Sequence, residues 1–274
     1  FWPRAERFTY YVLFPAMLVF KLGQARLPPS AYGDTAMLII AMLLAMTLVL
    51  VAAQWLWGWS GPVFSSLYQG AIRFNSYVGL AAGGMLLGDD GLSLTAIAVA
   101  IMVPLLNLLC ILMFALVAGR EQINLAAVIR AIVTNPLIVG SVIGVLWSYF
   151  QVGFHPLLAG ILEPLSNLAL PMGLMCVGAG LQLSALRGGS VPFIVSSALK
   201  LVAFPLMTAG LAWMLGLEGL LVQVAVLLAA LPTATSAYIL ARQLGGDAPL
   251  MAGIISGQTL LAMVSIPVLL SLLW

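Results

Sequence analysis

The sequence predicts an all-α protein that crosses a lipid membrane several times. Apolar residues make up 63% of the 274-residue chain, and the mean hydropathy is +1.17, whereas soluble domains are typically about 45–50% apolar. Charged residues account for only 7% of the chain, which is too few to keep the surface of a water-soluble protein hydrated. A membrane helix needs about 20 apolar residues, so the length allows several spans.

Nine apolar segments, separated by clusters of glycine, proline and charged residues, are the expected spans. No soluble domain or low-complexity segment interrupts them. The segments are residues 8–22, 36–57, 64–87, 94–117, 127–149, 157–183, 191–215, 220–241 and 250–273.

The basic residues of the connecting loops favour one side of the membrane. Counted on alternate sides from the N-terminus, six arginines fall on one side (Arg4, Arg7, Arg120, Arg130, Arg187 and Arg242) and only Lys21 and Arg26 on the other. The side richer in basic residues is expected to be cytoplasmic. This places the Arg120–Arg130 loop in the cytoplasm and the C-terminus in the periplasm or outside the cell. The expected location is the inner, or plasma, membrane.

Short sequence echoes recur five segments apart. Residues 14–17 resemble 170–173, and residues 75–77 with Gly83-Gly84 resemble 235–238 with Gly245-Gly246. Because five is odd, the two halves would have opposite orientations in the membrane, an inverted five-helix repeat of the kind found in secondary transporters. The predicted halves are residues 1–117, with four spans, and 127–274, with five, joined by a cytoplasmic linker at 118–126. The fifth segment lacks a partner, so a span preceding Phe1 is expected to be missing from this chain.

Arg73 lies deep in the third segment, on a predicted polar stripe. It is about nine residues from the start of the segment, roughly 14 Å by helical rise, and a charge at the bilayer centre costs roughly 3 kcal/mol or more. No acidic residue lies in the middle of a span to pair with it, so we expect its partner to be an anion that binds reversibly. The alternative is that Arg73 extends to the headgroups or bonds a nearby carbonyl. The stripe, at i, i+4, i+7 and i+8, is Gln69, Arg73, Ser76 and Tyr77, and Gly70 and Gly79 are expected to weaken the helix around it.

The eighth segment is interrupted by proline followed by hydroxyl residues. Pro232 lacks an N–H and frees a carbonyl, and the side chains of Thr233, Thr235 and Ser236 can bind either exposed backbone groups or a ligand. The internal repeat matches this region to the one around Arg73 and favours a binding site. The alternative is a simple proline kink capped by hydroxyl groups.

Three further polar residues are candidates for gating or anion contact. Lys200 lies about ten residues into the seventh segment and could equally extend to the cytoplasmic surface. Asn107 and Gln258 could instead form hydrogen bonds between helices. Cys110 and Cys176 are expected to be packing thiols. No set of residues resembles a hydrolytic site, a metal site or a phosphate-binding loop, so no enzyme activity, cofactor or metal is expected.

These motifs resemble those of the auxin efflux carrier family, which includes bacterial malonate-type permeases and plant auxin exporters and is similar to bile acid/sodium symporters. The resemblance covers nearly the whole chain. It implies a ten-helix inverted repeat, of which this chain lacks the first helix, and two broken helices that cross at the substrate site with Asn75 and Pro232 at the crossover. Many relatives have a proline in the first crossing helix, where this chain has Gly79-Leu80-Ala81-Ala82. The motifs are Phe14-Pro15-Ala16, residues 69–75, Asn135-Pro136-Leu137, Pro171 with Gly178-Ala179-Gly180, and residues 231–234 with 245–247.

The sequence therefore predicts a secondary transporter for a small organic anion, such as a mono- or dicarboxylate, that works by elevator-like alternating access. A negative cell interior favours outward movement of an anion by about 2.3 kcal/mol per charge per 100 mV, so export would need no coupling ion. One alternative is a sodium-coupled organic anion symporter of the bile-acid type, and another is a non-transporting membrane sensor or assembly protein. The expected partners are the anion, the lipid bilayer and a second copy in a homodimer, and no nucleic acid is expected.

Overall fold

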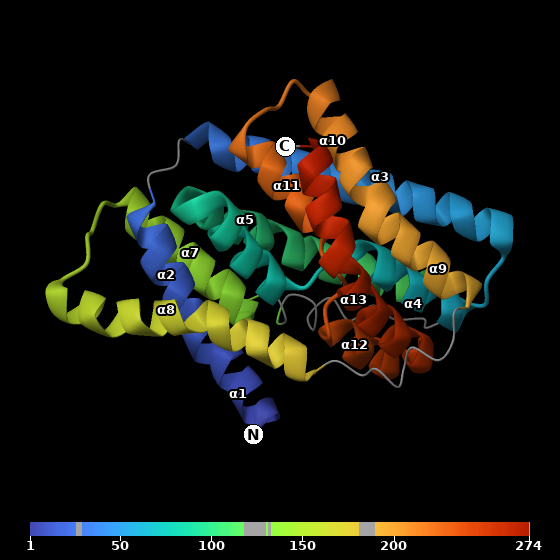
Figure 1. Cartoon of the computed structure of the whole chain (residues 1–274), viewed down its shortest axis with the longest axis horizontal. Helices are drawn as coiled ribbons and strands as arrows, with labels where there is room; N and C mark the ends of the chain where they lie inside the picture. Colours follow the sequence, from blue (N-terminus) through green and yellow to red (C-terminus); the bar gives the residue numbers. More distant parts are fainter. Residues whose placement is uncertain (26–28, 118–129, 131–132, 181–189, 274) are drawn as a thin grey trace. The chain divides into compact units, whose positions relative to one another are not determined.

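The computed structural model describes residues 1–25, 29–117, 130, 133–180 and 190–273, and the structural statements below concern these residues. Their secondary structure consists of α-helices and two π-helical turns, labelled η, with no strand in the described ranges (Figure 1). The prediction of an all-α polytopic membrane protein is confirmed. Five described helical stretches are long and apolar enough to cross a membrane: Tyr32–Trp57, Gly61–Val117, Pro156–Ala179, Val191–Met214 and Ala248–Leu272.

Each of the nine predicted segments is at least partly helical in the described residues. Helix α5 runs through parts of the third and fourth segments, with a non-helical backbone at Gly88 (φ 72°, ψ −164°) between them. The predicted linker at residues 118–126, together with Arg26, Arg120 and Arg187, lies outside the described residues. In chain order, the elements are α1 (Trp2–Phe8), η1 (Thr9–Leu13), α2 (Phe14–Gln24), α3 (Pro29–Trp57), α4 (Gly61–Ile72), α5 (Ser76–Val117), α7 (Pro136–Tyr149), α8 (Pro156–Ala179), α9 (Val191–Ala198), η3 (Leu199–Ala203), α10 (Phe204–Met214), α11 (Leu220–Ala230), α12 (Ser236–Leu244) and α13 (Ala248–Leu273).

The Asn135-Pro136 motif is a helix start. Asn135 is the N-cap of α7, and its side-chain oxygen accepts a hydrogen bond of 2.9 Å from the backbone N–H of Leu137. Pro136 occupies the first helical position, where a missing N–H costs nothing and the fixed φ suits a helix. The motif therefore sets where α7 begins.

The chain forms two compact units that alternate along the sequence. The first unit comprises Phe1–Gly33, Ser76–Pro104 and Leu125–Gly180, and the second comprises Asp34–Asn75, Leu105–Asn124 and Leu181–Trp274. The division into two inverted halves at residues 1–117 and 127–274 is a different partition of the chain, and it stays a prediction.

In the first unit, α2 packs closely against α7. A Cβ atom added at Gly144 would lie 2.7 Å from the carbonyl oxygen of Leu18, and one at Gly140 would lie 3.0 Å from the Cα of Pro15. Helices in membranes approach one another through such small residues, because lipid chains give no hydrophobic drive for helix association. Two glycines one turn apart thus allow the backbones of α2 and α7 to touch.

Loop contacts within each unit agree with the predicted alternation of sides. In the first unit, Lys21 and Asp89 form an ion pair of 2.6 Å, which joins the ends of the first and third predicted segments. In the second unit, the N–H of Asp247 donates to the carbonyl of Pro62 at 3.0 Å, which joins the starts of the third and ninth segments. Which end is cytoplasmic stays a prediction. Glu163, within the predicted span 157–183, lies exposed on α8.

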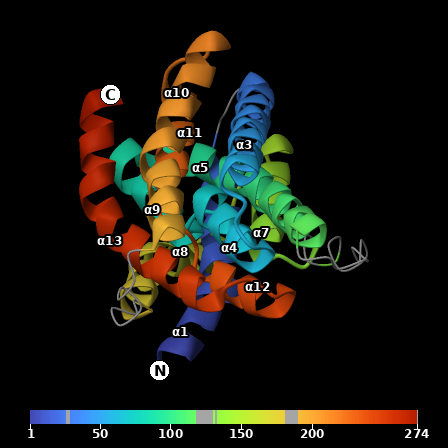
Figure 2. The ribbon, with the colours of Figure 1, turned by 90° about the vertical axis from the view of Figure 1, so that its right-hand side faces the viewer.

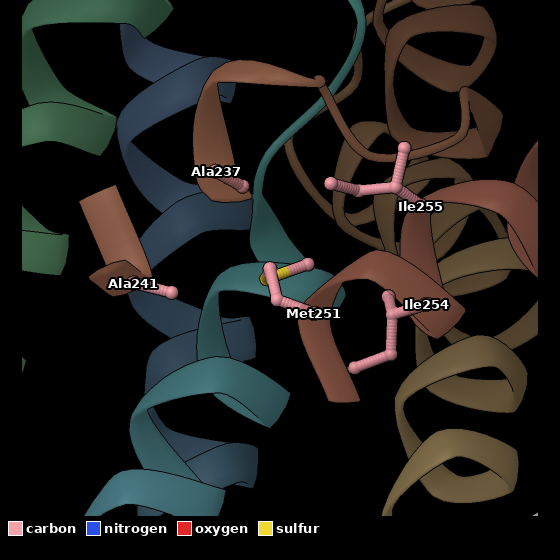
Figure 3. Packing of buried hydrophobic residues seen from close by; sticks show 5 residues of the cluster. All are labelled: Ala237, Ala241, Met251, Ile254 and Ile255. Atoms are coloured by element: carbon pink, nitrogen blue, oxygen red, sulfur yellow. The ribbon is translucent and has the colours of Figure 1, made fainter. Parts of the chain in front are cut away.

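In the second unit, α9, η3 and α10 continue one another as a single helical rod (Figure 2). The rod packs against α4, α11 and α13. In the same unit, α12 and α13 form a helical hairpin whose contact is a buried apolar cluster of Ala237, Ala241, Met251, Ile254 and Ile255 (Figure 3). The cluster fixes the direction of α12 relative to α13.

Both π-helical turns immediately precede a Phe-Pro pair. The N–H of Phe14 bonds the carbonyl of Thr9, and the N–H of Phe204 bonds that of Leu199, in each case five residues back. The following proline cannot donate a hydrogen bond, and the wider turn accommodates this loss within the helix. Pro171, which the sequence echo matches to Pro15, lies instead inside the regular helix α8.

We expect Gly144→Ala to destabilise the protein by about 1–3 kcal/mol, because the added methyl group would overlap a backbone oxygen that cannot move without distorting α2. The measurement is the melting temperature of the detergent-purified protein. Gly160→Ala on α8 is the control, since no atom lies within 4 Å of the position that its methyl group would occupy. Equal melting temperatures for the two variants would contradict the close packing.

Candidate functional site

The third segment is broken, as predicted, although at a different residue. Helix α4 ends at Ile72, Arg73 has an extended backbone (φ −73°, ψ 155°), and α5 begins at Ser76. Gly70 and Gly79, expected to weaken the helix, both lie within regular helix. The prediction of one continuous polar stripe is therefore wrong, because Arg73 lies in the break and Ser76 follows it.

The eighth segment is broken at the predicted proline. Helix α11 ends at Ala230, Leu231 is extended (ψ 147°), and α12 begins at Ser236. The sequence echo aligned Ser76 with Ser236, and the structure gives both the same local position, the first residue of the second half-helix.

The two breaks meet within the second unit. The backbone N–H of Asn75 donates a 2.8 Å hydrogen bond to the carbonyl of Pro232. Asn75 is 4% exposed and Thr233 is fully buried, so the contact is shielded from the surroundings. Backbone groups freed by a break inside the membrane must find partners in the protein, and here each break supplies a partner for the other.

Gln258 of α13 ties the breaks together. Its side-chain oxygen accepts from the N–H of Thr233 at 3.1 Å, and its side-chain nitrogen donates to the carbonyl of Gly70 at 3.0 Å. The hydroxyl of Thr233 also donates to the carbonyl of Gly70, at 2.7 Å. Gln258 is fully buried. From the sequence, Gln258 could serve in gating or anion contact, or it could form hydrogen bonds between helices. The structure shows the second of these roles.

Ser196 of α9 belongs to the same cluster, although it was not predicted as a site residue. Its hydroxyl donates to the carbonyl of Leu67 at 3.2 Å, and a Cβ atom on Gly70 would overlap its oxygen. The sequence feature that could have indicated a site residue is its position, four residues before Lys200 in an otherwise apolar segment.

The guanidinium of Arg73 points to the second break. Its Nη2 donates to the hydroxyl of Ser236 at 3.3 Å, while Nη1 is buried and has no hydrogen-bond partner. The buried thiol of Cys110 lies beside it. Within the described residues, Arg73 forms no ion pair. The contact of the side chain with the start of α12 favours a position at the breaks over one that extends to the headgroups.

Two more side chains of the second unit are buried without partners. Gln69 is fully buried, and neither its amide oxygen nor its amide nitrogen has a hydrogen-bond partner. Lys200 is also fully buried, and its Nζ has no hydrogen-bond partner and lies 4.7 Å from the centre of the Phe204 ring. The alternative that Lys200 extends to the cytoplasmic surface is therefore wrong.

The four remaining predicted site residues are Ser76, Tyr77, Asn107 and Thr235. Tyr77 belongs to the first unit, where it stacks on Phe14 with ring centres 4.8 Å apart, and Ser76 belongs to the same unit. Thr235 is the partly buried N-cap of α12, and Asn107 is partly buried on α5. Within the described ranges, no group of three or more His, Cys, Asp or Glu side chains could hold a metal ion.

Comparison with known proteins gives the family. The model of a family described as membrane transport protein matches residues 122–270, more than half of the chain. The chain belongs to the auxin efflux carrier family of membrane transport proteins. The family resemblance inferred from the sequence motifs is thereby confirmed, and the protein is a membrane transporter. The matched region includes the second break, Lys200 and Gln258.

Two relatives agree with membership of this carrier family. An uncharacterized transporter of the archaeon Methanothermobacter thermautotrophicus is 26% identical over 268 residues, which cover 96% of this chain and 86% of that protein. Auxin efflux carrier component 3a of rice is 29% identical over 141 residues, which cover 46% of this chain but only 23% of the rice protein.

We expect Gln258→Leu to lower the stability of the carrier markedly, because it leaves the buried N–H of Thr233 without its acceptor. Each buried polar group left unpaired costs about 1–3 kcal/mol. The measurement is the melting temperature in detergent. Thr259→Val is the matched control one residue along α13, because it removes only a bond to the carbonyl of Ile255 in the same helix. If both variants melt at the wild-type temperature, Gln258 does not hold the breaks together.

Proposed function

We propose that this transporter carries a small organic anion, such as a mono- or dicarboxylate, and binds it where the two breaks meet. The observation that supports this most directly is the guanidinium of Arg73, which has a buried Nη1 without an acceptor and forms no ion pair among the described residues. Arginine stays charged in proteins, so a cation in this position needs an anion. Its planar fork of donors matches the two oxygens of a carboxylate.

The groups around Arg73 complement the same ligand. Ser236 begins α12, and a helix N-terminus carries a partial positive charge that attracts anions. The unpaired amide of Gln69, one turn before Arg73 on α4, adds donors. We therefore assign the carboxylate to Arg73, Ser236 and Gln69, with Asn75, Pro232, Thr233 and Thr235 shaping the backbone around it. Asn107, which belongs to the same unit as Arg73, stays a candidate for contact with the rest of the solute.

The proposed mechanism is elevator-like alternating access. Asn75, Pro232, Gln258 and Ser196 all belong to the second unit, so the hydrogen bonds between the breaks can persist while that unit moves as one body. A site held by such bonds would keep its geometry on both sides of the membrane. The charge count of the loops favours an inner, or plasma, membrane with Arg130 on the cytoplasmic side. The rice relative is named for efflux, which favours outward movement.

We expect Arg73→Gln to weaken binding of the transported anion about 10- to 100-fold, the equivalent of roughly 1.5–3 kcal/mol for a hydrogen-bonded charge. Binding is measured by thermal shift of the purified protein with a panel of mono- and dicarboxylates, and transport by uptake of the stabilising acid into proteoliposomes. Arg242→Gln is the control, because Arg242 is exposed on the same half-helix that contacts Arg73.

Four results would argue against the proposal or favour one of its alternatives. Stabilisation by cationic or neutral solutes alone would exclude an anion carrier. Equal affinity and flux for wild type and Arg73→Gln would remove Arg73 from the site. Binding without any flux would favour the sensor alternative, and flux that stops when sodium is replaced by choline would favour the sodium-coupled symporter.

A further inference from the structure

We propose that Lys200 takes up one proton when the anion binds and gives it back when the anion leaves, so that the carrier moves each anion together with a proton. This inference rests on the proposed function above, and it adds the coupling ion. It starts from the position of Lys200, a lysine enclosed in the core of the unit that contains both helix breaks.

Lys200 lies beside the crossover without any polar partner. Its residue is 0% exposed, and its Nζ makes no hydrogen bond and lies over the face of the Phe204 ring, 4.7 Å from the ring centre. The η3 turn that carries it packs against α4 and α11, the two half-helices that end at the breaks, and against α13, which carries Gln258. One turn before it on the same rod, Ser196 bonds α4 at Leu67.

No carboxylate lies on the helices around η3. The elements packed against it are α4, α9, α10, α11 and α13. With the residues that cap these helices included, their titratable or charged groups are Tyr68 on α4, Arg73 at its end and Asp247 before the start of α13. The carboxylate of Asp247 accepts a hydrogen bond from the N–H of Leu250 at 2.9 Å at that end of α13. The hydroxyl of Tyr68 is hydrogen-bonded to Thr47 at 2.9 Å, and Arg73 is itself a cation. In the empty carrier, an ammonium group on Lys200 would therefore have neither an acceptor nor a counterion.

Such an arrangement couples the charge of Lys200 to the occupancy of the site. A charged group enclosed away from water is costly unless it is paired, and a buried group avoids this cost by becoming neutral. A bound anion at the crossover is the missing counterion, so it favours the ammonium form. By reciprocity, the ammonium form favours the anion. Arg73 cannot act in this way because its guanidinium does not lose a proton in proteins.

The proton balance of one transport cycle follows. The neutral amine of Lys200 accepts a proton from the aqueous phase on the side where the anion enters, and it forms an N–H bond. The same bond breaks on the other side when the anion leaves, and the proton returns to water. A monocarboxylate carried in this way crosses the membrane without net charge, and a dicarboxylate crosses with one negative charge.

The test is proton uptake on anion binding. Purified protein in weakly buffered detergent solution receives an equimolar mixture of acetate, pyruvate, malonate and succinate, adjusted to the pH of the sample, and a pH dye reports the protons taken up. We expect about one proton per bound anion, and an affinity that falls about tenfold per pH unit on the alkaline side. Binding itself is followed in parallel by thermal shift, so that an absence of binding is recognised separately.

Variants of Lys200 separate the roles of charge and titration. Lys200→Met keeps an unbranched apolar side chain against Phe204, and it should bind the mixture more weakly with no proton uptake. Lys200→Arg keeps a permanent charge, so any binding should lose its pH dependence. Lys21→Met removes a lysine of similar chemistry from the ion pair with Asp89 in the first unit, and it should take up protons like the wild type.

Each outcome decides the proposal. Binding by the wild type without proton uptake overturns the coupling but leaves the anion carrier standing, because the protonation state of Lys200 would then not change on binding. Unchanged proton uptake in folded Lys200→Met, judged by size-exclusion elution, assigns the proton to another group and also overturns it. An absence of binding and of flux for the whole mixture removes the proposed function and this inference together.

Discussion

The structure of the second unit depends on one constraint. The backbone groups that two helix breaks expose must find hydrogen-bond partners in the protein, because the membrane interior offers no water. The N–H of Asn75 meets the carbonyl of Pro232, and Gln258 bonds both the N–H of Thr233 and the carbonyl of Gly70. In hydrocarbon, each unpaired group would cost several kcal/mol. These bonds hold the breaks at a fixed position relative to each other, and they thereby place the guanidinium of Arg73 at the start of α12.

Local sequence predicted that both breaks exist, and it located one of them. Pro232 marks the second break because proline removes an N–H whatever its surroundings. The first break was assigned to the two flanking glycines, since glycine weakens a helix. The structure shows a different use for Gly70, whose missing side chain makes room for Ser196 and Ile254. The break lies at Arg73–Asn75 because the carbonyl of Pro232, far away in the sequence, accepts the N–H of Asn75.

Depth in the membrane could also be predicted, whereas side-chain direction could not. Counting residues placed Arg73 and Lys200 well inside their segments, but long basic side chains can turn either toward the headgroups or toward the protein interior. The packing of η3 against three other helices decides this for Lys200. The bonds of Gln258 with Thr233 and Gly70 are likewise invisible in a single segment, since they join residues of three different segments of the chain.

The π-helical turn η3 sets which sides of the long rod face its neighbours. Ser196 before the turn bonds α4, and Thr208 after it lies 3.5 Å from the sulfur of Met42 on α3. In an unbroken α-helix, residues twelve apart lie roughly 120° from each other around the axis, and the extra residue of a π turn removes most of this angle. Loss of one residue between them would leave a regular helix in which the two residues, then eleven apart, keep nearly the same relative direction, whereas a regular helix of the present length would rotate α10 away from α3. The irregular turn is what allows a single rod to serve two partners along its length.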